Sequence, residues 1–312
     1  MQFISGTRQI HIDEPTIVTI GKFDGRHKGH QKLLREMIRL KQEYGYKTAV
    51  FTFDMMPAGV VTGRRQSVIT TNQERRINMD KMGVDYLVEY PFDGQVSLMN
   101  PEDFVREVLV GGMNAKVIVA GTDCRFGYQR TGDAVLLKSL SDRYGYQAVI
   151  IKKEQDDHRD ISSTYIREEL DKGDIEKANE LLGEPYSIHG TVIHGNHIGT
   201  SLGFPTANII PPPNKHLPPC GVYVSRVLVK GQAYGGVSNI GKKPTVDGDH
   251  PIGIETFIMG LTEDLYGEEI EIQLLHFCRP EQKFDSLEAL SLQMKKDRQT
   301  AAAYLRNIKK DE

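Results

Sequence analysis

The sequence predicts an α/β protein in two parts, a doubly wound parallel sheet followed by an antiparallel β-barrel with a terminal helix. Three observations favour this fold. The chain has 312 residues, about twice the length of a usual domain. Short apolar runs alternate with helical patterns through the first half. From Tyr186 onward, strand-like runs separated by Gly, Pro and Asn dominate, which is typical of an antiparallel sheet.

The first half contains five strand-like runs, several of them apolar on both faces. They are IVTI (17–20), TAVFTF (48–53), VDYLVEY (84–90), KVIVAG (116–121) and YQAVII (146–151). After the first run, QKLLREMIRLKQEY repeats apolar residues at helical spacing, and Gly45 suits its end. Another helix should open at Asn100 and Pro101, as a cap followed by a first-turn proline. This alternation indicates a parallel sheet covered on both sides by helices.

The second half contains a series of short strand-like runs. They are YSIHGTVIHG (186–195), GVYVSRVLVKG (221–231), QAYGGVSNIG (232–241), IGIETFIMG (252–260) and EEIEIQLLHF (268–277). A final amphipathic helix is expected over 285–306, with Asp285 and Glu288 at capping-box spacing. Two short helices divided at Gly173 link the halves. The predicted domains are therefore 1–184 and 185–312.

Composition excludes several classes of protein. The net charge of −3 argues against nucleic acid as the main partner, since a nucleic-acid-binding surface needs clustered Lys and Arg. No apolar run approaches the roughly 18 residues of a membrane span, and the start lacks a signal-peptide pattern. Cys124, Cys220 and Cys278 lie far apart without a C-x-x-C pattern, which disfavours a disulfide framework or a zinc ribbon. A reducing cytoplasm is the expected compartment.

The stretch GKFDGRHKGHQKLL (21–34) places His27 and His30 between a predicted strand and a predicted helix. A zinc site would need three or four ligands, which this stretch does not supply, and simple packing is the other alternative. However, three glycines flank the pair and would let a ligand approach the backbone. The helix start offers unpaired N–H groups and the positive end of a dipole. We therefore expect the two histidines to bind phosphates.

This H-x-G-H stretch resembles the first motif of bacterial FAD synthetases, the bifunctional riboflavin kinase/FMN adenylyltransferases. ISSTYIREEL (161–170) is similar to their S-S-T-x-I-R motif, and GTDCRFGYQRTGD (121–133) to their flavin-side segment. GNHIGTSLGFPTANI (195–209) resembles the P-T-A-N signature of riboflavin kinases. GVSNIGKKPTV (236–246) and DLYGEEIEI (264–272) resemble later kinase segments. The motifs stand in family order and cover nearly the whole chain.

For the first half, the resemblance implies a nucleotidylyltransferase-like domain in which the phosphate of FMN attacks the α-phosphorus of ATP and expels pyrophosphate. His27 and His30 would be catalytic contacts to the phosphates. The implied nucleotide-binding residues are Gly21, Phe23, Gly29, Ser163, Thr164 and Arg167. Asp123 and Arg125 would contact the flavin. Taken alone, S-S-T could be a plain helix cap, and Asp123 with Arg125 a solvated pair.

For the second half, the resemblance implies a riboflavin kinase. A hydroxyl must attack the γ-phosphate of ATP, which needs a base, a cation and close backbone contacts. Thr206 and Asn208 would bind Mg²⁺ with ATP, and Glu255 would take the 5′-hydroxyl proton of riboflavin. The implied phosphate loop carries Gly195, Gly199 and Gly203, without the Walker pattern. Taken alone, P-T-A-N could be a turn, and Glu255 a solvent-facing strand residue.

Three places depart from the family pattern. Met55 and Met56 replace a proline and a histidine, Cys124 replaces an aromatic residue, and Phe257 replaces a histidine two residues after Glu255. Three alternatives therefore stay open: a riboflavin kinase with a weakened or idle adenylyltransferase half, a flavin-binding regulator, and another H-x-G-H enzyme such as a cytidylyltransferase. The expected partners are riboflavin, FMN, FAD and ATP, with a transient homo-oligomer left open.

Overall fold

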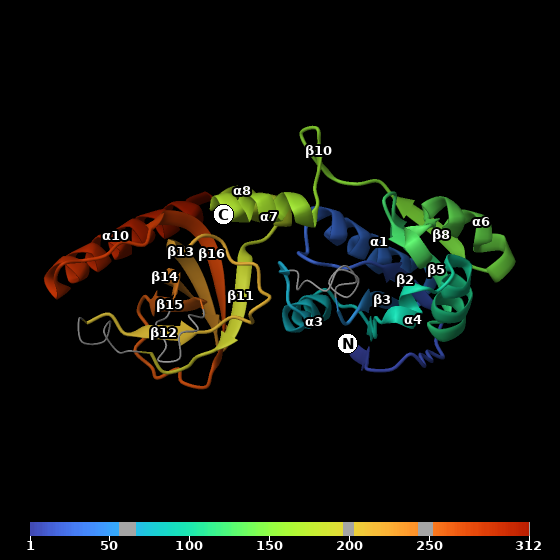
Figure 1. Ribbon diagram of the computed structural model, residues 1–312, viewed down its shortest axis with the longest axis horizontal. Helices are drawn as coiled ribbons and strands as arrows, with labels where there is room; N and C mark the ends of the chain where they lie inside the picture. Colours follow the sequence, from blue (N-terminus) through green and yellow to red (C-terminus); the bar gives the residue numbers. More distant parts are fainter. Residues whose placement is uncertain (56–66, 196–202, 243–251, 312) are drawn as a thin grey trace. The chain divides into compact units, whose positions relative to one another are not determined.

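The computed structural model describes residues 1–55, 67–195, 203–242 and 252–311 (Figure 1). The chain forms two compact units, Met1–Ser163 and Thr164–Glu312. The predicted domains, 1–184 and 185–312, are meant as segments that fold independently. Their boundary stays a prediction. Within the described ranges, no helix combines the length and the apolar character that crossing a bilayer requires.

The first unit is a six-stranded parallel sheet in the order β1-β4-β3-β2-β5-β8. Its strands are β1 (Gln2–Ser5), β2 (Thr16–Ile20), β3 (Lys47–Phe53), β4 (Tyr86–Tyr90), β5 (Ala115–Gly121) and β8 (Gln147–Ile151). The five predicted strands are confirmed, and β1 is an additional edge strand. From β2 the chain continues to β3 on one side, while β5 lies on the other. In such sheets a crevice opens beyond the carboxyl end of the strand where the direction reverses.

Helices and short hairpins complete this unit. They are α1 (Lys28–Tyr44), α3 (Asn72–Lys81), α4 (Gly94–Ser97), α5 (Pro101–Asp103), the π-helix η1 (Phe104–Gly112), η2 (Tyr128–Arg130), α6 (Ala134–Tyr144) and the hairpins β6 (Arg125–Phe126) with β7 (Gly132–Asp133) and β9 (Gln155–Asp156) with β10 (Arg159–Asp160). The Asn100 side chain accepts the amide of Glu102, which confirms the predicted cap of α5. Gly45 ends α1 with a φ of 72°, as glycine does at helix ends.

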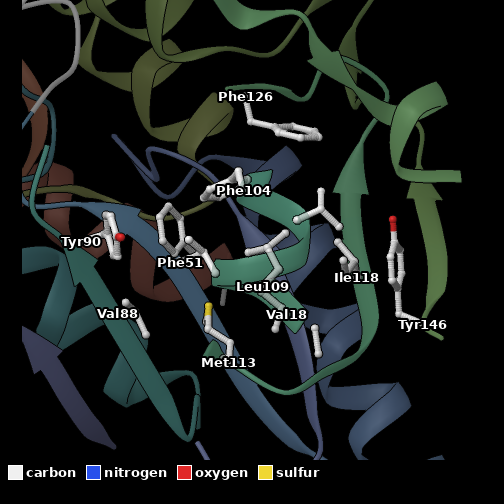
Figure 2. Packing of buried hydrophobic residues seen from close by; sticks show 14 of the residues in the cluster. Val18, Phe51, Val88, Tyr90, Phe104, Leu109, Met113, Ile118, Phe126 and Tyr146 are labelled. Carbon is white, nitrogen blue, oxygen red and sulfur yellow. The ribbon is translucent and has the colours of Figure 1, made fainter. Parts of the chain in front are cut away.

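Two apolar clusters cover the two faces of the sheet. One joins α1 and α3 to β2, β3 and β4, through residues such as Leu34, Met37 and Met79. The other gathers residues of η1, α6 and the strands (Figure 2). In it the Phe104 ring lies 5.1 Å from Phe51 and 5.6 Å from Phe126, measured between centroids. The segment around Phe126 is therefore anchored in the core.

The second unit is a six-stranded antiparallel sheet in the order β11-β16-β13-β14-β15-β12. Its strands are β11 (Tyr186–Thr191), β12 (Thr206–Ile209), β13 (Gly221–Val229), β14 (Gln232–Lys242), β15 (Ile252–Ile258) and β16 (Glu269–Pro280). Just beyond β11, the amide of Ile193 donates to the Asn208 carbonyl at 2.8 Å. This bridge joins the two edges, so the sheet curls into the predicted barrel.

Among the described residues of the second unit, the helices are α7 (Ser163–Lys172, whose first residue counts with the first unit), α8 (Ile175–Leu182) and α10 (Leu287–Asp311). Gly173 divides α7 from α8 with a φ of 78°, as predicted. Asn179 holds α8 on the barrel, since its side chain donates to the Leu274 carbonyl and accepts the Tyr186 amide. The predicted capping box of α10, with Asp285 as the cap and Glu288 three residues later, is wrong. Ser286 is the capping residue, and its hydroxyl accepts the amide of Ala289.

Candidate active sites

The loop between β2 and α1 is anchored by Asp24, which is almost fully buried. Its carboxylate oxygen Oδ1 accepts the amides of Ile69 at 2.7 Å and Thr70 at 3.1 Å. The Thr70 hydroxyl in turn accepts the amide of Gly25 at 3.0 Å. These bonds hold the loop between β2 and α1 against the segment before α3. Asp24 therefore has a structural role in this loop.

The glycines of this loop make room for the protein's own side chains. A Cβ at Gly21 would lie 3.0 Å from the ring of Phe23, and one at Gly29 would lie 3.1 Å from Nδ1 of His27. Phe23 itself is buried and has a positive φ of 49°. The roles of these three residues at the adenylate stay predictions, and their local function is to let the loop fold tightly.

His27 caps α1, and its ring stacks on that of His30. The Nδ1 atom of His27 accepts the backbone amide of His30 at 3.4 Å. The ring centroids are 3.7 Å apart with an interplanar angle of 21°. The Nδ1 atom of His30 lies 2.8 Å from the Gly25 carbonyl oxygen. The structure thus brings the two predicted histidines together at the helix start.

These contacts define which ring nitrogen carries the proton. Because Nδ1 of His27 accepts a hydrogen bond, the proton of its neutral ring is on Nε2. Because a carbonyl only accepts, Nδ1 of His30 carries the proton of that ring, and its Nε2 keeps a lone pair. The two histidines therefore offer a phosphate different groups, a donor on His27 and a base on His30.

Burial keeps both rings neutral. It lowers the pKa of His27 to about 2, with further contributions from the charges of His30 and Lys153. Burial also lowers the pKa of His30, although the Gly25 carbonyl and the charges of Asp24 and Asp123 oppose this effect. The pair therefore supplies hydrogen-bonding groups and little positive charge in the absence of a ligand.

The S-S-T motif meets this loop through Ser163, whose hydroxyl donates to the Asp24 carbonyl at 2.5 Å. The hydroxyl proton is thus used within the protein. Thr164 and Arg167 lie on α7 in the second unit. Contacts of all three residues with ATP phosphates stay predictions.

Asp123 is joined to a lysine that is not among the residues that the motifs predict. The Nζ atom of Lys153 lies 3.2 Å from Asp123 Oδ2 and 2.9 Å from Asp160 Oδ2. Arg125 is exposed and lies 3.8 Å from Asp133, so the structure does not pair it with Asp123. The available sequence signal for Lys153 was its place two residues after a predicted strand, close to where ligand-binding residues of parallel sheets are found.

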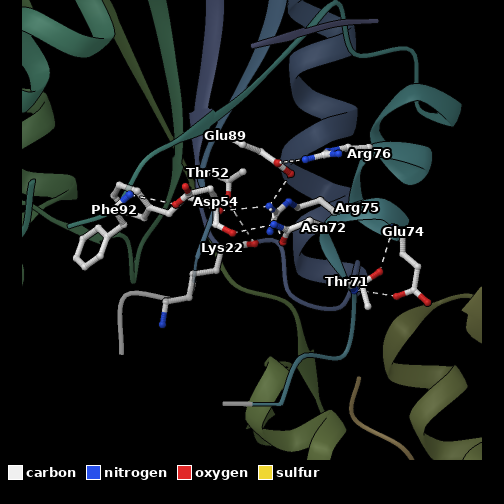
Figure 3. A network of polar contacts seen from close by, with 11 residues as sticks. Lys22, Thr52, Asp54, Thr71, Asn72, Glu74, Arg75, Arg76, Glu89 and Phe92 are labelled. Carbon is white, nitrogen blue, oxygen red and sulfur yellow. Dashed lines mark hydrogen bonds and ion pairs between the residues drawn. The ribbon is translucent and has the colours of Figure 1, made fainter. Parts of the chain in front are cut away.

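A buried ion-pair network lies at the ends of β3 and β4 (Figure 3). The carboxylate of Glu89 contacts both Arg75 and Arg76 at 2.7 Å, and only Arg76 is substantially exposed. Arg75 also donates to the Phe53 carbonyl at 3.2 Å and to Asn72 at 3.1 Å. The network fixes the carboxyl end of β3 to α3, and the motifs do not predict it.

The departures from the family pattern have different surroundings. Met55 is exposed, and Met56 lies outside the described residues. Cys124 packs against the core, and burial raises the pKa of its thiol to about 12, so it is not a reactive cysteine. In the second unit, Phe257 packs edge-on against Phe204 with ring centroids 5.3 Å apart. The side chain of Phe257 therefore has a packing role.

In the second unit, the register brings the predicted kinase residues to one place. TANI forms strand β12 rather than a turn. Asn208 lies directly opposite Glu255 of β15, and Thr206 opposite Phe257. On its other side Glu255 faces Asn239 of β14. Directly opposite residues point to the same face with Cβ atoms roughly 5 Å apart, so Thr206, Asn208 and Glu255 share a face.

The P-T-A-N asparagine is buried, and its amide nitrogen lies 3.4 Å from the Thr206 hydroxyl. A Cβ at Gly195 would lie 2.4 Å from this nitrogen, so only glycine fits beside it. Gly203 has a positive φ of 81°, and Gly199 lies outside the described residues. Phosphate binding by these glycines stays a prediction.

No cluster of three or more His, Cys, Asp or Glu side chains suited to a metal occurs in the part of the chain that the structure describes. The candidate metal donors are instead the side-chain oxygens of Thr206 and Asn208 on their shared face. Magnesium commonly takes few protein oxygens and completes its shell with phosphate and water. The donor set therefore fits magnesium that arrives with ATP.

Known proteins match both units. A family model described as FAD synthetase matches residues 9–165, and one described as riboflavin kinase matches residues 182–305. The bifunctional riboflavin kinase/FMN adenylyltransferase of Listeria monocytogenes is 36% identical over 294 residues, 94% of this chain and 93% of the relative. That of Bacillus subtilis is 33% identical over 97% of this chain and 100% of the relative. A solved structure from Streptococcus pneumoniae, described as a macrolide-efflux protein, has 32% identity and a TM-score of 0.86, and covers 96% of this chain and 98% of its own.

Proposed function

The chain belongs to the family of bifunctional riboflavin kinase/FMN adenylyltransferases, and from this premise we propose how its own residues carry out the two reactions. Like its relatives it is an enzyme that phosphorylates riboflavin to FMN and adenylylates FMN to FAD, with ATP as co-substrate. The adenylyltransferase part is N-terminal and the kinase part C-terminal.

In adenylyl transfer, an oxygen of the FMN phosphate bonds to the α-phosphorus of ATP while the bond to pyrophosphate breaks. No covalent bond to the protein is needed, so the protein contributes positioning and charge stabilisation. The proposal is supported by the stacked histidines at the start of α1, beyond the carboxyl end of the central strand β2. His27 donates from Nε2 to a phosphate oxygen. The lone pair on Nε2 of His30 takes a proton as the phosphates bring negative charge.

The surroundings of the histidines support a nucleotide site. The start of α1, where the positive end of the helix dipole lies, favours an anion. Gly21 and Phe23 lie in the turn before the helix and Gly29 in its first turn, and we assign all three to the adenylate side. Ser163 holds the loop through the Asp24 carbonyl, and Thr164 and Arg167 follow it on α7 as further phosphate contacts. Asp123, just beyond β5, and Arg125, the first residue of β6, are assigned to the flavin side.

In the kinase reaction, Glu255 takes the proton of the riboflavin 5′-hydroxyl while that oxygen attacks the γ-phosphorus of ATP. The observation that supports this role is the register that places Glu255 opposite Asn208. Thr206 and Asn208 would hold Mg²⁺, which neutralises charge on the ATP phosphates. Gly195, Gly199 and Gly203 would form the loop beside them. The kinase centre therefore combines a base and hard oxygen donors on one face of the barrel.

The test is direct. The protein is incubated with riboflavin, ATP and Mg²⁺, and riboflavin, FMN and FAD are separated by chromatography while pyrophosphate is assayed. FMN should appear first and FAD second, with one pyrophosphate released for each FAD. FMN alone would indicate an idle adenylyltransferase half, and binding of flavin without turnover would indicate a regulator. Three free cysteines, each partly buried, support a reducing cytoplasm as the compartment.

A further inference from the structure

The adenylyltransferase centre needs positive charge that its histidines do not carry in the free protein. Both rings are neutral there, for the reasons given above. The triphosphate of ATP carries several negative charges, and the departing pyrophosphate gains more. Preorganised cations are the usual means of stabilising such charge. A cation close to the pair, in addition to the assigned Arg167, would therefore stabilise this charge.

Lys153 is placed to supply it. In the sheet, β2 lies beside β5 and β5 beside β8, all parallel, so their carboxyl ends lie side by side (Figure 1). His27 follows β2, Asp123 follows β5, and Lys153 comes two residues after β8. The ammonium of Lys153 is close enough to His27 to disfavour protonation of that ring. The crevice that the sheet topology predicts for a ligand thus holds this ammonium beside the histidines.

Lys153 can exchange one of its carboxylate partners for a phosphate. Asp123 is 61% exposed, and ion pairs with such exposed carboxylates are weak because water screens them. Asp160, on the hairpin β9–β10, makes the second pair, and Gln155 donates to the other oxygen of Asp160. A polyphosphate is a stronger partner for an ammonium than one solvated carboxylate. The lysine can therefore leave Asp123 and keep Asp160.

We propose that Lys153 binds the triphosphate of ATP in the adenylyltransferase site, exchanging the Asp123 carboxylate for a phosphate oxygen. The inference rests on the proposed function of the first unit and adds a residue to it. The competing explanation is that Lys153 only clamps the hairpin β9–β10 through Asp160. The two explanations differ for a variant that breaks the clamp but keeps the ammonium, Asp160→Asn.

The experiment compares variants in the full-length protein, with FMN saturating and ATP varied. Lys153→Met keeps the aliphatic stem and removes the charge, and should lower kcat/KM for ATP at least tenfold, mainly through KM. Lys153→Arg should stay within threefold of the unchanged protein, and so should Asp160→Asn. Lys32→Met is a matched control, since Lys32 is a neighbouring lysine of similar exposure that pairs with Glu154 at 2.5 Å. It should also stay within threefold.

Inorganic pyrophosphate gives a second readout. Its inhibition constant should rise at least tenfold in Lys153→Met, while the KM for FMN changes less than twofold. Riboflavin phosphorylation should stay within twofold in every variant, which shows that the chain is folded. An unchanged kcat/KM for ATP in Lys153→Met, or an equal loss in Asp160→Asn, would overturn the proposal. Failure of the unchanged protein to make FAD from FMN would instead refute the adenylyltransferase assignment itself.

Discussion

Replacing His27 by asparagine separates the two roles that the structure gives this residue. The histidine caps α1 through Nδ1, and its Nε2–H is the proposed donor to ATP. Asparagine is among the best N-cap residues, so His27→Asn should keep the cap while removing the donor. Alanine at the same position loses both. The comparison therefore isolates the chemical role from the structural one.

The magnitudes follow from these contacts. Losing one preorganised donor to a charged transition state costs about 100- to 1000-fold in turnover, so FAD formation from FMN should fall by that factor in both variants. Losing the cap costs about 1 kcal/mol, so only His27→Ala should show a lower midpoint of thermal unfolding for the first unit. Riboflavin phosphorylation, which belongs to the other unit, should be unchanged in both.

The same residue makes stability depend on pH. The pKa of His27 falls from its ordinary value of 6.5 to about 2 in the folded protein. The unfolded chain therefore binds more protons below pH 6.5, and the stabilisation that is present above this pH is lost as the pH falls. From pH 6.5 to 5 the loss should be about 2 kcal/mol. Urea unfolding of the first unit at the two pH values measures it, and His27→Asn should flatten the dependence.

Two results would refute this reasoning. If His27→Asn keeps more than a third of the FAD-forming turnover, the Nε2 donor does not act in the reaction. If it unfolds as easily as His27→Ala, the side chain does not cap the helix in the way described.

Three further predictions follow from the described contacts. Glu255→Gln should lower riboflavin phosphorylation about 100- to 10,000-fold with a nearly constant KM for riboflavin, and a turnover within twofold of normal would reject the base. Glu89→Gln leaves Arg75 without its buried anion, so urea unfolding should show the first unit destabilised by about 3–5 kcal/mol. A fragment of residues 164–312 should phosphorylate riboflavin without making FAD. A shorter fragment, residues 184–312, should also phosphorylate riboflavin but unfold at a lower temperature, because it lacks α8, whose side chains bond to and pack on the barrel. Equal midpoints of thermal unfolding for the two fragments would contradict this role of α8.

Much of the fold was predictable because local patterns decide it. The strands β2 to β5 are rich in β-branched and apolar residues and mostly buried, β8 is apolar and half-buried, and α1 carries its apolar residues at helical spacing. The edge strand β1 escaped prediction because its four residues are mostly exposed and show no distinctive pattern. Strand β12 is equally short, follows a proline, and is held by pairing with β15, more than forty residues away along the chain.

Some residues of the candidate sites were likewise predictable from local patterns, and others were not. His27 and His30 were predictable because one continuous motif places both at a helix start. Lys153 and the Glu89 network were not, because their positions depend on which strand ends meet and on which charges are buried together. The assignment of protons within the histidine pair was equally hidden, since it depends on backbone groups that approach the rings only in the folded chain.

Two independent centres in this one chain should act in series, and mixing two variants, each with one centre disabled, measures whether they do. His27→Asn and Glu255→Gln are assayed with riboflavin, ATP and Mg²⁺, first separately and then together. Alone, the first variant should stop at FMN, and the second should leave riboflavin unchanged but convert supplied FMN to FAD. The mixture should make FAD from riboflavin, because FMN released by one variant can be used by the other. Loss of both activities in either variant would contradict the account.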